Sequence, residues 1–315
     1  MARNARHLIL ASATGYSWSQ ISPFVDSLRR SGFAGNVLML IGPQPADVPE
    51  HLRAAGIQMW PVHPWLSRLP TWWRRKFYSR RFGLIHRGYP WLCDRLPLPA
   101  ATRRLIKAWL ARPFHHIACS RYFFYLSFLT AHARDYDRVM LSDVRDVLFQ
   151  EDPFSHFNAA PLQFFLEHRT VFIGQHSGNA NWVRGACSEA ALAAIADHRV
   201  SCSGITLGST AGILRYLAAM TDQLALATPR ISGFDGYDQG VHNHLIWTGA
   251  FPDAELFENN RGPVLSMHGM PSDEIHCNDR GQVVGDDGHV IPVLHQYDRH
   301  PALRDRLLAA LTNEA

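Results

Sequence analysis

The sequence predicts an α/β fold in which a parallel sheet is flanked by helices. In the first 60 residues, short apolar runs with the length of buried strands alternate with segments of helical spacing, separated by tight loops. Repeated β-α-β order of this kind implies a parallel sheet. The 315 residues are 47% hydrophobic and 18% charged, which is enough apolar material for a large core and argues against an extensively disordered chain.

The first elements follow in order from this pattern. Uninterrupted apolar runs identify the strands, and apolar residues at helical spacing identify the helices. The loop after the first strand, residues 12–16, lacks the Gly-x-Gly-x-x-Gly fingerprint of dinucleotide-binding proteins, which argues against a dehydrogenase. The expected elements are a strand at residues 7–11, a helix at 21–30, a strand at 36–41, a helix at 51–55 and a short strand at 57–60.

Residues 63–116 interrupt the pattern with a strongly basic, aromatic insertion. Its twelve Lys and Arg residues face one acid, Asp94, and are interleaved with Trp, Tyr and Phe. This mixture suits an anionic membrane surface and equally suits RNA or single-stranded nucleic acid. A solvated helical insertion, packed on the domain by its aromatic side chains, is the third interpretation. Nucleic acid is the least favoured, because no recognition motif accompanies the charge and the whole chain carries only +4.

The next elements lead to an acidic motif. An aromatic helix is expected from Arg121, and the apolar run at 138–141 has the length of a buried strand. Asp143 and Asp146 follow that strand, with Arg145 between them. Strand ends commonly hold ligand sites in α/β sheets, and paired carboxylates are the hard oxygen ligands that Mg²⁺ or Mn²⁺ prefers. An acidic turn, with Asp146 paired to Arg145, explains the spacing equally well.

This motif, followed by Asp-Pro-Phe at 152–154, resembles the Asp-x-Asp region of GT-A fold glycosyltransferases. Glycogenin-like enzymes and plant enzymes with Asp-Val-Asp before Asp-Pro-Phe are the most similar groups. The resemblance implies a GT-A, Rossmann-like fold, with a mixed, mainly parallel sheet flanked by helices, and a nucleotide-sugar donor. Asp146 stands at the second acid of the motif, which is expected to bind the metal. Val144 stands at the first, so Asp143 is displaced by one residue, and its assignment to metal, to ribose or to neither stays open.

The same resemblance extends to the C-terminal half. A strand beginning at Ser201-Cys-Ser-Gly resembles the segment near the transferred sugar, where small residues let a sugar approach the backbone. A helix opening at Tyr237-Asp-Gln resembles the Asp-Gln…Asn element of the glycogenin-like group and implies catalytic roles for Asp238 and Gln239 at the anomeric centre. A helix N-cap is the other interpretation of Asp238.

A histidine near the C-terminus often completes the metal site of GT-A enzymes. His295, at the end of a short apolar run, fits that place, and neutral imidazole is an acceptable Mn²⁺ ligand. His268 is the competing third ligand, and Arg299 and His300 are placed to neutralise the leaving diphosphate. The donor-binding residues implied by the resemblance are Ala13, Thr14, Tyr16, Arg121, Asp143, Arg145, Ser203, Gly204, Asn243 and Arg299; the metal ligands are Asp146, His295 and Asp143.

The resemblance implies transfer of a hexose or similar sugar from a nucleotide-diphosphate donor to a hydroxyl acceptor, with Mn²⁺ or Mg²⁺ as cofactor. UDP is favoured as the commonest donor nucleotide of the fold, and the Asp-Gln element favours a retaining reaction. We expect one GT-A-like domain over residues 1–315, acting on a glycan or glycolipid. Scattered cysteines and the lack of a long apolar run favour a cytoplasmic protein, held peripherally at the inner face of a membrane if the insertion binds lipid.

Two other classes remain open. One is a different metal-dependent enzyme of phosphoryl or nucleotidyl transfer that uses Asp143 and Asp146. Such enzymes usually carry a Lys-rich or Gly-rich phosphate loop, and the sequence has none. The other is a non-catalytic protein that binds anionic lipid or nucleic acid through residues 63–116.

Overall fold

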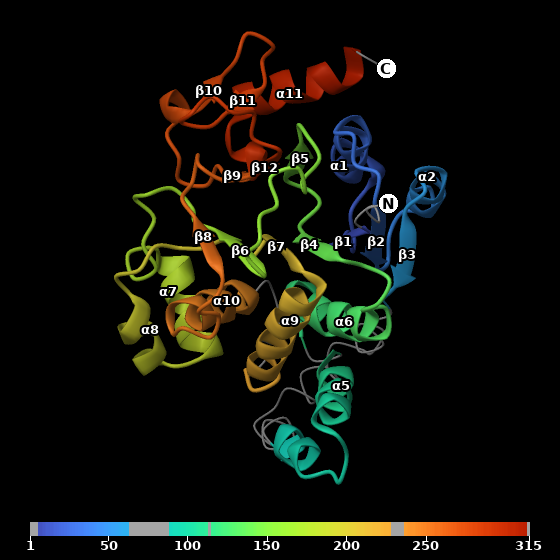
Figure 1. Ribbon diagram of the computed structural model, residues 1–315, viewed down its shortest axis with the longest axis vertical. Coiled ribbons are helices and arrows are strands. Elements are labelled where there is room, and N and C mark those ends of the chain that lie inside the picture. Colours follow the sequence, from blue (N-terminus) through green and yellow to red (C-terminus); the bar gives the residue numbers. More distant parts are fainter. Residues whose placement is uncertain (1–5, 63–87, 113–114, 228–235, 314–315) are drawn as a thin grey trace.

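A seven-stranded mixed sheet forms the centre of the molecule (Figure 1) and confirms the α/β class. The computed structural model describes residues 6–62, 88–112, 115–227 and 236–313. Strand β7 runs antiparallel to both of its neighbours, while the other pairs in the sheet are parallel. The strands, in spatial order, are β3 (Gln58–Pro61), β2 (Asn36–Ile41), β1 (His7–Ser12), β4 (Arg138–Ser142), β7 (Ile205–Ser209), β6 (Leu162–Phe165) and β8 (Glu255–Phe257).

Helices cover both faces of this sheet because its strands are apolar on both sides. In β1, Leu8 and Leu10 face the core beneath α6, α9 and α10, while Ile9 and Ala11 face the core beneath α1 and α2. Side chains alternate across a strand, so a continuous apolar run buries both faces at once. The helices concerned are α1 (Trp18–Arg30), α2 (Val48–Ala54), α6 (Ile117–Ala131), α9 (Thr210–Leu224) and α10 (Tyr237–Trp247).

The N-terminal elements agree with the sequence prediction. The strands expected at residues 7–11 and 36–41 are β1 and β2, and their pairing is parallel as expected. Helix α1 begins earlier than its apolar spacing indicated, after Ser17, whose backbone N–H donates to Oε1 of Gln20 at 3.0 Å. That bond satisfies a donor left free at the helix start, which apolar spacing does not show.

A smaller three-stranded sheet adjoins the main one. Its order is β5 (Val147–Phe149), β12 (Val293–His295) and β9 (Val264–Ser266), so the last strand of the chain lies between the other two. Strand β12 pairs antiparallel with β5 and parallel with β9. Helix α11 (Pro301–Asn313) and the hairpin of β10 (His276–Cys277) and β11 (Val283–Val284) complete this part, with short 3₁₀ turns at Ser272–Glu274 and Tyr297–Arg299.

Two further helices, α7 (Ser177–Ala186) and α8 (Glu189–Ile195), pack beside α10. The glycines of this contact are close-packing positions. A Cβ on Gly240 of α10 would lie 2.6 Å from the backbone of Trp182 in α7. Close approach of α7 and α10 brings Trp182 to the wall of the main cavity described below.

The basic insertion is described in part, since residues 63–87 and 113–114 lie outside the described ranges. Residues 88–94 are helical, and α5 (Ala100–Ala111) packs on α6 and α9. Lys107 Nζ lies 2.7 Å from Asp94 Oδ1 and 3.5 Å from Asp222 Oδ1, and Arg104 Nε lies 2.9 Å from Asp222. Asp94 is therefore not the only acid that the insertion meets, because α9 supplies a second. No helix within the described ranges is long and apolar enough to cross a membrane.

Candidate metal and donor site

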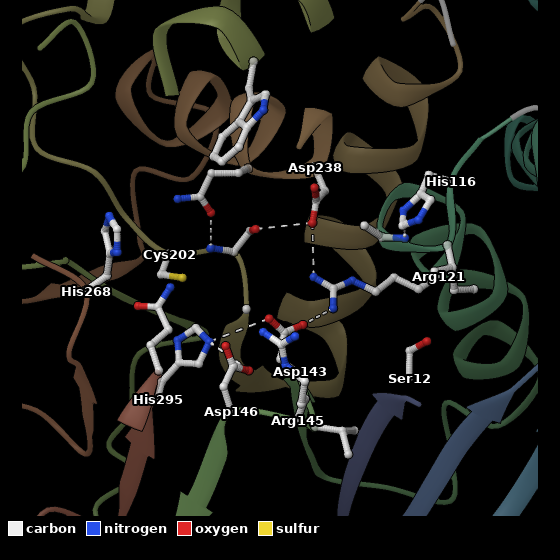
Figure 2. A pocket seen from close by; sticks show the side chains of 18 of the residues that line it. Ser12, His116, Arg121, Asp143, Arg145, Asp146, Cys202, Asp238, His268 and His295 are labelled. Atoms are coloured by element: carbon white, nitrogen blue, oxygen red, sulfur yellow. Dashed lines mark hydrogen bonds and ion pairs between the residues drawn. The ribbon is translucent and has the colours of Figure 1, made fainter. Parts of the chain in front are cut away.

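Polar residues from several elements line a cavity of about 450 Å³ at one edge of the main sheet (Figure 2). The segments that follow β1, β4 and β6 reach it, as does the segment that precedes the reversed strand β7. Parallel strands place their carboxyl ends at the same edge, where ligands of α/β proteins commonly bind. Because β7 runs the other way, its amino-terminal segment, residues 202–204, meets Asp143 at that edge.

Three potential metal ligands gather at one end of the cavity. One ligand atom from each of Asp143, Asp146 and His295 lies within 4.8 Å of the other two. The register of the small sheet brings them together, because His295 pairs with Val147, the residue after Asp146. The backbone of Gln296 also donates to the carbonyl of Asp146 at 2.7 Å. Nε2 of His295 lies 3.6 Å from Oδ2 of Asp143 and 3.9 Å from Oδ1 of Asp146.

Gly204 keeps the space between these groups open. Its carbonyl accepts a hydrogen bond from the backbone of Asp143 at 2.8 Å. A Cβ at this position would lie 2.5 Å from Cε1 of His295 and 2.6 Å from Oδ2 of Asp143. Neither ring nitrogen of His295 has a hydrogen-bond partner among the described residues. Two carboxylates and a buried imidazole whose Nε2 faces both of them fit a divalent cation such as Mn²⁺.

Asp143, Asp146 and His295 shift one another's pKa values because their opposite charges lie close together. Burial alone would raise the pKa of Asp143, but the charge of Arg121 and the His295 ring outweigh it and hold that pKa below its usual range. Burial raises the pKa of Asp146, with His295 opposing and Asp143 adding to the shift. For His295, burial favours a lower pKa, but Cys202, Asp143 and Asp146 outweigh it and raise the pKa well above its usual range. Asp143 and Asp146 therefore stabilise a positive charge that lies beside them.

Arg121 connects two of the predicted site carboxylates. It is the fifth residue of α6 and is buried; its Nη1 pairs with Oδ1 of Asp143, and its Nη2 lies 3.1 Å from Oδ2 of Asp238 (Figure 2). Burial lowers the pKa of Arg121, but Asp143 and its other neighbours outweigh this effect, so the guanidinium stays charged. Besides lining the cavity, Arg121 pairs with both Asp143 and Asp238 and so holds these two carboxylates at a fixed distance.

The predicted Asp-Gln helix is α10, and it holds the segment 201–203 by side-chain bonds. Oε1 of Gln239 accepts from the backbone of Ser203 at 2.7 Å, and Asn243 bonds both the N–H and the carbonyl of Ser201 at 2.8 and 2.9 Å. Asn243 does not line the cavity, because its amide is taken up by that backbone. The N-cap interpretation of Asp238 is wrong, since Gly236 holds the N-cap and Asp238 points toward Arg121.

Of the remaining residues predicted to form the site, some line the cavity and others point away from it. Ala13 is fully buried in the core and does not line the cavity. His300 bonds Ser272 and the carbonyl of Met267, which places its ring outside the cavity. His268 lines the cavity opposite His176, with the two Nε2 atoms 3.4 Å apart, and is not part of the three-residue group. Thr14, Tyr16, Arg145, Ser203, Gly204 and Arg299 line the cavity, together with Asp238 and Gln239.

Glu167 is the cavity residue of greatest chemical interest that sequence reasoning missed. It follows β6, is 3% exposed, and its Oε2 has no hydrogen-bond partner among the described residues. Burial raises its pKa to about 7, although the nearby His295 ring and Cys202 act in the opposite direction. An acid directly after the mainly apolar segment 162–166 was the available signal. His116, His176, Asn179, Trp182, Cys202 and Gln296 also line the cavity unpredicted.

Glu167 is expected to make the stability of the metal-free protein depend on pH. Its folded-state pKa of about 7 exceeds the ordinary 4.5, so the folded protein holds the proton more tightly than the unfolded chain. The stabilisation is complete below the unfolded-state value and is lost as pH rises through about 7, a loss of about 3 kcal/mol at high pH. Glu167→Gln should remove this slope in denaturant unfolding series with chelator present. Equal slopes in the variant and the parent protein would contradict this prediction.

Comparison with known proteins adds nothing to this geometry: no protein-family model and no curated protein matches the chain.

Proposed function

We propose that the protein is a metal-dependent glycosyltransferase of the GT-A type, which transfers a sugar from a UDP-sugar donor to a hydroxyl of a glycan or glycolipid. One observation carries the proposal. The motifs chosen by resemblance lie far apart in the sequence, at residues 12–16, 121, 143–146, 203–204, 238–239 and 295, and each contributes to the wall of one cavity. Its volume of about 450 Å³ is within the range of small-molecule sites.

The metal end of the cavity would receive the donor diphosphate. Asp143, Asp146 and His295 would hold Mn²⁺ or Mg²⁺, and such an ion neutralises the negative charge that grows on a leaving diphosphate. Arg145 and Arg299 line the same cavity and add positive charge, although Asp298 lies 3.7 Å from each of them. This arrangement supports a donor with a charged diphosphate at this end.

The wall formed by residues 203–204 and the start of α10, next to the metal end, is suited to a sugar. Ser203 and Gly204 present a small surface, and their backbone is held in place by Gln239. Asp238 is a buried carboxylate that accepts from Arg121 and, at 3.4 Å, from the hydroxyl of Ser203. A fixed carboxylate can accept hydrogen bonds from sugar hydroxyls or stabilise positive charge at the anomeric carbon. Thr14 and Tyr16, after β1, are left to contact the nucleoside. We assign a retaining course on the strength of the Asp-Gln element.

The test is donor hydrolysis with a panel of nucleotide sugars and of nucleoside triphosphates, each with Mn²⁺ and with chelator. We expect UDP release from at least one UDP-sugar in the presence of Mn²⁺, and none with chelator. Turnover of a nucleoside triphosphate but of no nucleotide sugar would instead assign the carboxylates to phosphoryl or nucleotidyl transfer. Absence of both turnover and Mn²⁺-dependent UDP binding in calorimetry would overturn the proposal.

A further inference from the structure

Charge in this protein is strongly segregated. Residues 63–116 hold twelve of the 31 basic residues but one of the 27 acidic ones, so this segment carries +11 and the rest of the chain −7. The described part that projects from the body, residues 88–111, is here named the arm and comprises the helix at 88–94 and α5. In Figure 1 the arm lies below α6 and α9, at the opposite end of the molecule from α11.

The arm also carries the exposed apolar side chains. Among the described residues, the large hydrophobic side chains that are exposed are Trp91, Leu92, Leu98, Trp109 and Leu226, each at least 40% accessible. Four of them belong to the arm. Leu226 follows α9 at the point where the arm joins it, since the hydroxyl of Tyr89 lies 3.3 Å from the carbonyl of Ala225. Scattered exposed leucines need no explanation, but a concentration of this kind marks an interaction surface.

The arm is not a loose segment with accidental exposure. Its inner side is packed, with Cys93, Ala108 and Ala111 buried. Lys107 joins the helix at 88–94 to α9 through its contacts with Asp94 and Asp222. The ion pairs of Lys107 and the buried small residues therefore hold the two helices in place, while the tryptophans and leucines of the arm stay exposed.

The chemistry of the outer surface selects its partner. Trp is favoured at the boundary between lipid tails and head groups, and leucine side chains partition into the acyl region. The guanidinium of Arg95 lies 3.7 Å from the ring centre of Trp91, which places a cation beside an interfacial aromatic. Nucleic acid fits less well, because leucines cannot stack on bases as aromatic rings do. Arg104 and Lys107 are also occupied by carboxylates.

We propose that the arm docks the protein on an anionic lipid bilayer through Trp91, Leu92 and Trp109, with Arg95 and Arg103 near the head groups. The charges of Arg95 and Arg103 supply the attraction, and the exposed apolar side chains enter the interface. Helix α6 follows the arm in the chain and lines the cavity with Ile117 and Arg121, so α6 joins the docked arm to the cavity wall. Docking does not depend on the proposed transfer reaction.

The test is co-sedimentation of the full-length protein with vesicles of phosphatidylglycerol and phosphatidylcholine, compared with phosphatidylcholine alone. We expect binding to the anionic vesicles only, weakened by added salt. Replacing Arg95 and Arg103 by Gln should weaken vesicle binding about thirtyfold, because two basic residues each lose their attraction to the charged surface. Trp91→Ser with Trp109→Ser should abolish most of the binding. Arg53→Gln with Arg280→Gln, which changes two exposed arginines away from the arm, is the matched control and should bind as the parent protein does.

Two further measurements, UDP binding and single-stranded RNA binding, separate the docking proposal from its alternatives. Mn²⁺-dependent UDP binding by calorimetry should be unchanged in all of these variants, because none of the altered residues lines the cavity. Its absence in every variant and in the parent would count against the donor site and not against docking. Failure to sediment with anionic vesicles at low salt would overturn the docking proposal. So would arm variants that sediment normally, or arm-dependent binding of single-stranded RNA without vesicle binding.

Discussion

Asp146→Ala is expected to abolish Mn²⁺-dependent binding of UDP while leaving the fold intact. The substitution removes one of the two carboxylates in the candidate metal group. Loss of partners that merely orient ligands costs about 10–100-fold in metal affinity, so loss of a ligand should cost more than about 100-fold. The fold should persist because Asp146 contributes to the pairing of β5 and β12 through its carbonyl, which alanine keeps. Calorimetric titration with UDP, with and without Mn²⁺, measures the effect.

A second change reaches the same group without removing a ligand. Gly204→Ala places a methyl group against Asp143 and His295, at 2.6 and 2.5 Å, and should also weaken Mn²⁺-dependent binding. Gly88→Ala is the matched control, since a methyl group there meets nothing within 4 Å. Unchanged affinity in Asp146→Ala would remove that residue from the metal site, whatever Gly204→Ala does.

Asp238→Asn is expected to slow sugar transfer by at least about 10²-fold, the low end for a positioned acid–base group. Asparagine keeps the shape of the side chain and one acceptor oxygen but removes its charge. UDP affinity should change little, because Asp143, Asp146 and His295 are untouched. Initial rates of transfer or donor hydrolysis under saturating UDP-sugar measure the effect.

The control for Asp238→Asn must account for a lost ion pair. Asp238 is buried beside Arg121, and breaking a buried pair can destabilise a protein by about 3–5 kcal/mol. Arg121 retains Asp143, so the cost here should be smaller. Thermal unfolding of the variant sets the assay temperature, and Asp222→Asn, which weakens the pairs with Arg104 and Lys107 outside the cavity, is the comparison variant. Full turnover by Asp238→Asn would make Asp238 a positioning partner of Arg121 and nothing more.

The fold was readable from the sequence where local pattern determines structure. Strands β1, β2 and β4 are continuous apolar runs buried on both faces, and a strand of that kind has few alternatives. The small sheet was harder to foresee. Strand β5 has only three residues. It pairs with β12 from the far end of the chain, so no pattern in the neighbouring sequence predicts the pairing.

The sequence predicted which segments reach the candidate site, but not which side chains of those segments line the cavity. Motif order identified the loop 12–16, yet within it Thr14 lines the cavity and Ala13 is buried in the core. A loop sequence does not give the direction of each side chain, and the same limit explains why Asn243 was assigned to the donor. Glu167 was missed because an acid after a strand is common, and only its burial makes it unusual.

The position of β12 has a consequence for how the protein acquires its site. His295 and Asp146 are roughly 150 residues apart, and bringing such distant points together costs chain entropy that grows only slowly with length. Synthesis must pass β12 before the third ligand exists, so a nascent chain would hold the paired aspartates without the imidazole. A divalent cation bound by all three would act as a cross-link between the middle and the end of the chain. Because the unfolded chain lacks this arrangement, the ion would favour the closed native loop by mass action.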